Sequence, residues 1–145
     1  MAAPGLEAHD RGPWVERRLP TNLRIIRPTE REVLAHLVEH GYDDDRRFAV
    51  RLALEEALVN AMKHGNRLDP GRSVRLAYRV TDECVEIRVA DEGNGFTVAG
   101  VPDPTRDENL QRPCGRGIML MRSYMDAVEY SPAGNEVRMV KYRDR

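Results

Sequence analysis

The sequence predicts a single-domain α/β two-layer sandwich, in which a mixed, mostly antiparallel sheet carries three helices on one face. Apolar residues recur at helical spacing between residues 23 and 64, and they alternate with polar residues in segments 74–80 and 85–89. The 145 residues are also enough for one domain with its own core. We therefore expect residues 14–145 to form the domain and residues 1–13 to be a disordered N-terminal tail.

The first elements are a strand and a helix. Segment Trp14–Pro20 is predicted as a short edge strand that its proline closes. A first helix is expected over residues 23–38, with Pro28 near its beginning and Gly41 just after its end.

A second helix is expected from Asp44 to His64. The aspartates at 43–45 supply an N-cap and an acidic first turn, which favour a helix start. Gly65 ends the helix, and residues 66–72, which contain Asp-Pro-Gly, form a turn.

The second half of the chain alternates strands with a long loop. Only three residues, 81–83, connect the two alternating segments, so they are predicted to pair antiparallel. Segment 91–117 is rich in glycine, proline and aspartate, and a loop of this length is usually a functional lid. The closing elements are a third helix and a hairpin, at residues 117–125, 126–130 and 136–142.

A polar stripe on the second helix is the most informative feature. Glu56, Asn60, Lys63 and His64 fall within about 100° of one another on a helical wheel. Apolar residues flank them on both sides, and the second flank consists of Phe48, Leu52 and Val59. Unpaired polar groups between two buried flanks would cost several kcal/mol, so a ligand is one explanation and a solvent-facing stripe is the other.

A glycine-rich acidic turn follows the second alternating segment. Asp91 is expected at the carboxyl end of that strand, where its carboxylate can accept a hydrogen bond from an exocyclic amine. Gly93 and Gly95 would let the backbone approach a planar base. An ordinary acidic turn is the alternative.

A second glycine pair opens the third helix. Gly115, Arg116 and Gly117 would place free backbone N–H groups at a helix N-terminus, which favours phosphate. This signal is weak alone, because the chain has neither the GxxxxGK[ST] loop nor the GxGxxG fingerprint.

Charge and cysteine content exclude some functions. The net charge is −1, from 23 basic and 24 acidic residues, which does not favour nucleic acid or an anionic membrane surface. No apolar run reaches the ~18 residues of a membrane span. Cys84 and Cys114 are isolated and interpreted as free thiols, so we expect a cytoplasmic protein.

The three motifs occur in one order: an E-x-x-x-N helix, a strand followed by DxGxGF, and a GxG before a helix. In this order they resemble the GHKL (histidine-kinase-like) ATPase superfamily, whose ATP-binding fold is the Bergerat type. Within it the chain is similar to the anti-sigma-factor serine/threonine kinase family. The likeness covers nearly everything from Trp14 to Tyr142 and includes residues 55–66 and 115–126.

The resemblance implies a role for the residues on the helix and after the strand. Asn60 matches the asparagine that binds Mg²⁺ at the nucleotide phosphates, and Glu56 matches the general base. Asp91 matches the aspartate that recognises the adenine amino group, and Gly93 and Gly95 flank the base.

The lid residues also have family counterparts. Gly115 and Gly117 match the lid hinge that receives phosphate, and Arg116 is beside them. Lys63 matches a lysine that approaches the terminal phosphates in histidine kinases. The chain departs from the pattern at Asn135, where relatives often carry a threonine.

The resemblance further implies a function: an ATP- and Mg²⁺-dependent protein kinase that binds a sigma factor and phosphorylates a serine of an anti-anti-sigma (STAS-type) partner. Relatives often form a homodimer through the sheet. Two alternatives stay open, namely a catalytically silent ATP-binding regulatory module and a stand-alone histidine-kinase-type ATPase domain.

Overall fold

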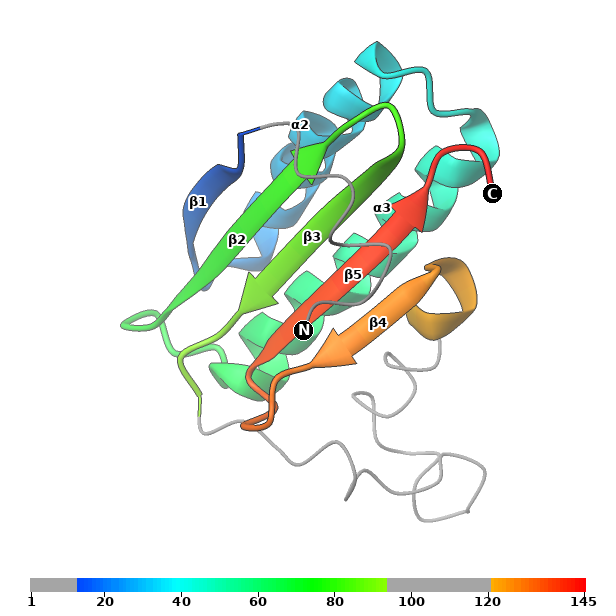
Figure 1. The fold of residues 1–145 in the computed structure, drawn as a ribbon. Coiled ribbons are helices and arrows are strands. Elements are labelled where there is room, and N and C mark those ends of the chain that lie inside the picture. The colour runs from blue at the N-terminus through cyan, green and yellow to red at the C-terminus, as the bar shows by residue number, and fades with distance from the viewer. Residues whose placement is uncertain (1–12, 94–120) are drawn as a thin grey trace.

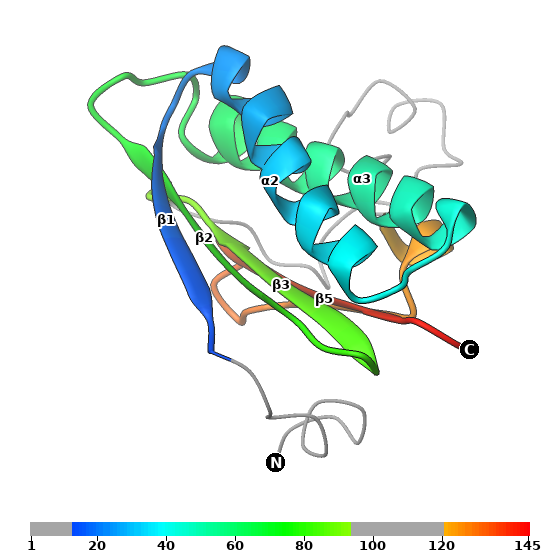
Figure 2. The ribbon, with the colours of Figure 1, turned by 90° about the horizontal axis from the view of Figure 1, so that it is seen from above.

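The computed structural model describes residues 13–93 and 121–145. These residues form two layers, with a five-stranded sheet on one side and the helices packed together on one of its faces (Figures 1 and 2). The predicted α/β two-layer sandwich is confirmed. The expected N-terminal tail lies outside the described residues except for Pro13, and so does most of the expected lid.

The sheet has the strand order β1-β2-β3-β5-β4. All four pairings between these described strands are antiparallel, whereas the sequence predicted a mixed, mostly antiparallel sheet. The connections of residues 81–83 and 131–135 are short, which favours the antiparallel pairing of β2 with β3 and of β4 with β5. The strands are β1 (Val15–Pro20), β2 (Ser73–Val80), β3 (Cys84–Ala90), β4 (Ala127–Tyr130) and β5 (Glu136–Tyr142).

The two central strands place their apolar residues on the helical side. In β2, Leu76 and Tyr78 are buried in the core and pair with Val89 and Ile87 of β3. The alternation of apolar and polar residues in the sequence therefore corresponds to the two faces of the sheet. Among the described strands, β1 pairs only with β2 and lies at the edge of the sheet, as predicted.

The first helical segment begins with the 3₁₀ turn η1 (Leu23–Ile25) and continues as α2 (Ile26–Glu39). The side chain of Asn22 accepts a hydrogen bond from the backbone N of Arg24 at 3.0 Å and caps the turn. The helix ends before Gly41, whose φ of 77° is the left-handed conformation that glycine adopts without strain.

The second helix begins where the sequence predicts. Helix α3 (Asp44–Val59) is capped by Asp43, whose Oδ1 accepts a hydrogen bond from the backbone N of Arg46 at 2.8 Å. The helix does not stay regular to His64, however, because it changes at Asn60.

Residues Asn60–Gly65 form η2, a π-helical turn. Its wider turn is closed by a hydrogen bond from the backbone N of Asn66 to the carbonyl of Ala61, five residues earlier, at 2.8 Å. Such π turns are rare and often occur at functional sites.

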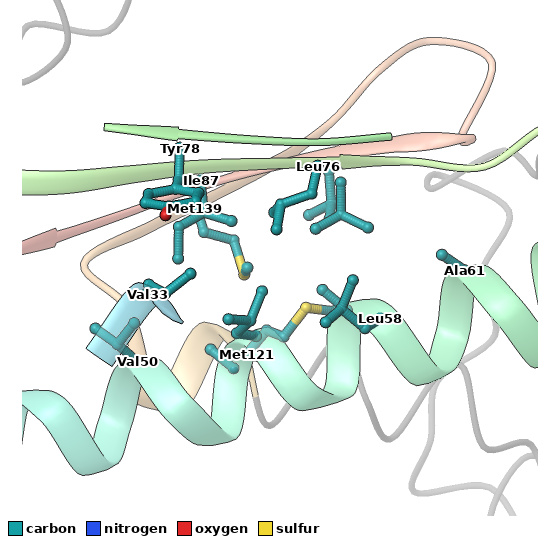
Figure 3. Packing of buried hydrophobic residues seen from close by; sticks show 14 of the residues in the cluster. Val33, Val50, Leu58, Ala61, Leu76, Tyr78, Ile87, Met121 and Met139 are labelled. Atoms are coloured by element: carbon teal, nitrogen blue, oxygen red, sulfur yellow. The ribbon is translucent and has the colours of Figure 1, made fainter. Parts of the chain in front are cut away.

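The core lies between the sheet and the helices (Figure 3). Leu58 of α3 faces Leu76 of the sheet, and the thioether of Met121 lies beside Leu58. Met121 belongs to the expected third helix. Of its described residues, 121–125, those from 121 to 124 are helical.

The second apolar flank predicted for α3 is not fully buried. Phe48 is 54% exposed and contacts Tyr124 edge-on, with 6.4 Å between ring centroids. Leu52 and Val59 are half-buried. The polar stripe therefore has one buried flank and one flank that is partly open to solvent. No helix in the described ranges is long and apolar enough to cross a membrane.

Candidate functional site

A hollow of about 110 Å³ lies where α3 passes into η2, opposite the end of β3 and the β4–β5 turn. It brings together Asn60 and Asp91, which are 31 residues apart in the sequence. Its walls are largely apolar and its polar groups are few, which is typical of a small-molecule site. The lining residues are Ala57, Asn60, Ala61, His64, Gly65, Val89, Asp91, Tyr130, Gly134, Asn135 and Val137.

Asp91 follows β3 directly, as predicted, and its carboxylate is held in place. Its Oδ1 accepts a hydrogen bond from the backbone N of Gly93 at 2.8 Å, and its own N donates to the carbonyl of Asn135 at 2.9 Å. Burial raises the pKa of Asp91, whereas the Gly93 bond and the charge of Arg72 lower it. Oδ2 makes no hydrogen bond to another described residue and can accept one from a ligand.

Two glycines permit the close approach of η2 to this carboxylate. A Cβ on Gly65 would lie 2.2 Å from Cγ and Oδ2 of Asp91, and a Cβ on Gly93 would lie 2.0 Å from the carbonyl O of Gly65. Real Cβ atoms do not make such contacts. Gly93 thus has a structural reason to be glycine, in addition to the predicted one that a planar base can approach its backbone. The sequence indicated Gly65 only as the end of a helix.

Asn60 is the first residue of η2 and lines the hollow. Its Nδ2 atom is buried without a hydrogen-bond partner among the described residues. A buried N–H donor without a partner is costly unless a ligand supplies an acceptor. Mg²⁺ binds side-chain oxygens such as that of Asn60, so the residue fits the predicted metal role.

Glu56 lies one turn before Asn60, in the last turn of α3. Burial raises the pKa of Glu56, and the neighbouring charge of Glu55 raises it further. A carboxylate with increased proton affinity is suited to general-base chemistry.

Lys63 and His64 differ in their positions. His64 lines the hollow, and its pKa is lowered by burial and by the adjacent Lys63 charge. Both side chains are exposed, but Lys63 is not among the residues that line the hollow. The structure therefore brings Asn60, His64, Asp91 and Asn135 together around the hollow. Neither Glu56 nor Lys63 is among the residues that line it.

The remaining predicted site residues, Gly95, Gly115, Arg116 and Gly117, lie outside the described residues. The same holds for most of the lid to which they were assigned.

Sequence reasoning missed Asn66, which is completely buried behind the site. Its Nδ2 donates to Thr21 Oγ1 and to the Ser73 carbonyl, each at 3.0 Å, and its Oδ1 accepts from the backbone N of Glu92 at 2.8 Å. It thus ties the end of η2 to β2 and to the residue that follows Asp91. In the sequence it resembled an ordinary turn residue after Gly65.

Curated relatives cover most of this chain. It is 29% identical over 139 residues to the serine-protein kinase RsbW of Bacillus subtilis, covering 89% of this chain and 85% of that protein. It is also 29% identical over 140 residues to the serine-protein kinase RsbW of Staphylococcus epidermidis, covering 89% and 86%.

A solved structure supports the fold. The crystal structure of the RsbU and RsbW domains of Rv1364c from Mycobacterium tuberculosis matches with a TM-score of 0.59 at 16% identity. The match covers 91% of this chain and 32% of that longer chain.

The histidine kinase-like ATPase domain family matches residues 19–141, which include every described element of the site. The order of the three motifs, the two-layer fold and this match agree with one another. The chain therefore belongs to the histidine kinase-like ATPase domain family.

Proposed function

We propose that this protein is an ATP- and Mg²⁺-dependent serine/threonine kinase that acts as an anti-sigma factor. It would bind a sigma factor and phosphorylate an anti-anti-sigma partner of the STAS type. The observation that carries the proposal is the single hollow in which an orphaned amide, Asn60, and a held carboxylate, Asp91, converge. The names of the RsbW relatives supply the reaction class.

The residues present fit an adenine nucleotide. Asp91 Oδ2 would accept a hydrogen bond from the adenine amino group, and Val89 and Val137 would pack on the faces of the base. Asn60 would hold Mg²⁺ through its side-chain oxygen. We further propose that Gly95, Gly115, Arg116 and Gly117 enclose the phosphates and that Lys63 reaches toward them.

Bound MgATP would supply the phosphoryl group, and its Mg²⁺ would neutralise the negative charge of the phosphates. The chain's own part in the chemistry is then limited, because phosphoryl transfer depends mainly on positioning and electrostatics. Glu56 would accept the proton of the attacking serine hydroxyl, and its raised pKa brings its proton affinity nearer to neutral pH.

The proposal also places the protein in the cytoplasm, as one domain of residues 14–145, with the homodimer as its assembly and without direct contact to nucleic acid or membrane. The near-neutral net charge of −1 supports the last two points.

Nucleotide binding with and without Mg²⁺ tests the site. Calorimetry should show ATP binding that needs Mg²⁺ and that Asn60→Ala abolishes, because the substitution removes the proposed metal ligand. Unchanged affinity in that variant would refute the metal assignment.

Labelled ATP and a STAS-type partner test the reaction. The wild-type protein should transfer label to a serine of the partner, whereas Glu56→Gln should keep ATP and lose transfer. ATP binding without any labelled partner would favour the silent regulatory module, and label on a histidine of another chain would favour the histidine-kinase-type domain.

A further inference from the structure

A second hollow, of about 280 Å³, lies where α2 packs beside α3 (Figure 2). It shares no described lining residue with the hollow around Asn60 and Asp91. Its α2 residues are spaced at i, i+3, i+4 and i+7, so they form one stripe along that helix. The lining residues are Arg27, Glu30, Arg31, Leu34 and Arg51.

The arginines of this hollow have donors that no described residue uses. Arg27 and Arg31 are exposed, and neither makes a hydrogen bond or an ion pair with another described residue. They lie four residues apart on one helix, where like charges repel each other. Arg51 comes from α3, and its Nε is 3.6 Å from Oε1 of Glu30, which is longer than a hydrogen bond.

Glu30 is the acid among these described lining residues, and it is only 3% exposed. Its Oε1 has no donor closer than the distant Arg51, and its Oε2 is buried without a hydrogen-bond partner among the described residues. A buried carboxyl in this state is costly unless a ligand supplies a donor. The hollow therefore combines unused donors with an unused acceptor.

This combination selects one kind of anion. The charge of Glu55 also acts on Glu30, so the arginines around the hollow still exceed the two acids by one. A carboxylate or sulfate ion would satisfy the guanidinium groups, but all its oxygens are acceptors and Glu30 would repel them. Hydrogen phosphate, HPO₄²⁻, accepts hydrogen bonds as well and carries one proton that it can donate to a carboxylate.

We propose that the hollow between α2 and α3 is a binding site for hydrogen phosphate, in which Arg27, Arg31 and Arg51 hold the anion and Glu30 accepts a hydrogen bond from its hydroxyl. Glu30 thereby distinguishes phosphate from sulfate, which has the same shape but no proton. The site does not depend on the proposed kinase reaction.

Titration of the full chain with inorganic phosphate at about pH 8 tests the site. Burial raises the pKa of Glu30 to about 7, so its carboxyl is then largely ionised, while phosphate is mostly HPO₄²⁻. In ¹⁵N NMR spectra, the side-chain Nε–H signals of Arg27, Arg31 and Arg51 should shift and saturate. Absence of a saturable shift overturns the proposal.

Sulfate at the same ionic strength tests the role of Glu30. It should bind at least about tenfold more weakly than phosphate, because the buried carboxylate would then face an oxygen without a proton. Glu30→Gln should bring the two affinities close together, because its amide can donate to either anion. Equal affinities in the wild-type protein overturn the role of Glu30, whether or not the variant folds.

One pair of variants locates the site. Arg31→Gln should weaken phosphate binding by about tenfold, because it removes a charged donor. Arg24→Gln is the matched control: Arg24 is also exposed and lies in the turn before α2, but it does not line the hollow. Circular dichroism should show that both variants are folded. Equal affinities for phosphate in the two variants would overturn the location.

The nucleotide site must be kept apart from this one. The phosphate titration is therefore repeated with excess MgATP, and the same three arginine signals should still shift. Loss of these shifts would show that phosphate binds where ATP binds, which overturns the proposal. If the chain binds no ATP, the proposed function fails, and the phosphate titration still decides whether this site exists.

Discussion

The two ends of the long central helix are built by different means. At its beginning, Asp43 caps the backbone three residues away and the sequence shows the cap directly. At its end, η2 depends on Asn66 and Gly65, which contact Thr21, Ser73, Glu92 and Asp91 from distant parts of the chain. The beginning of the helix is thus stabilised by local contacts, whereas the end that carries the site depends on long-range contacts.

Gly65→Ala should have the largest effect on the end of the helix that depends on long-range contacts. The new Cβ would meet the Asp91 carboxylate at 2.2 Å, so η2 or Asp91 must move. We expect a loss of about 3 kcal/mol in the free energy of unfolding, at the upper end of overpacking effects, together with loss of ATP binding. Urea unfolding and calorimetry measure the two effects.

Gly71→Ala is the matched control for this prediction. Gly71 lies in an exposed turn, where the nearest atom to a new Cβ is the flexible Asp69 carboxylate at 3.2 Å. If both alanine variants behave alike, the contact between Gly65 and Asp91 is not the reason for the glycine.

Asn66→Ala should have the next largest effect. It leaves the Glu92 N–H and the Ser73 carbonyl without the bonds that Asn66 gives them, which should lower the free energy of unfolding by about 2 kcal/mol. Urea unfolding measures the loss. Asn60→Ala is its comparison, because the Nδ2 of Asn60 has no partner among the described residues and its removal should leave stability nearly unchanged. Equal losses would contradict this assignment of the two amides.

The pH dependence of stability probes the middle of the helix, where Glu30 meets Arg51 and Glu55. The pKa of Glu30 is about 7 in the folded protein and 4.5, the ordinary glutamate value, in the unfolded chain. The native state therefore binds more protons than the unfolded state between these pH values. Its contribution to stability is therefore full below pH 4.5 and is lost as the pH rises to about 7.

Glu30→Gln should remove that pH dependence, which amounts to about 1–3 kcal/mol. Thermal unfolding of the two proteins from pH 4.5 to 8 measures it, since the variant isolates Glu30 from other carboxyls. Parallel stability curves across this range would show that Glu30 does not titrate there.

Asp43→Ala should have the smallest effect, because it removes one local cap. We expect a loss of about 1 kcal/mol in the free energy of unfolding and unchanged ATP affinity. A marked loss of ATP affinity would mean that the two ends of α3 are coupled and that the cap is not purely local.

Much of the fold was predictable because its signals are local. The cap at Asp43, the glycine at Gly41 and the alternation around Tyr78 each depend on neighbouring residues. The π turn at Asn60 was not predictable from the helical wheel, because the buried contacts of Asn66 select it. Phe48 was assigned to a buried flank, yet the flank is partly open and Phe48 contacts Tyr124.

The candidate site could be predicted only in part, because some of its signals are local and others depend on long-range contacts. The spacing of Glu56 and Asn60 and the place of Asp91 after a strand could be recognised in the sequence. The sequence did not show that Gly65 must admit the Asp91 carboxylate or that Asn66 supports it, because both facts concern segments that meet only in the folded chain.

The contact between η2 and Asp91 has a consequence for affinity. The Gly93 N–H holds the carboxylate before any ligand arrives, and the lack of a side chain at Gly65 leaves room for it. A ligand that meets a preorganised acceptor loses little further conformational entropy on binding. Substitutions that loosen this contact should therefore weaken binding through a more disordered free protein, even where every group that touches the ligand is retained.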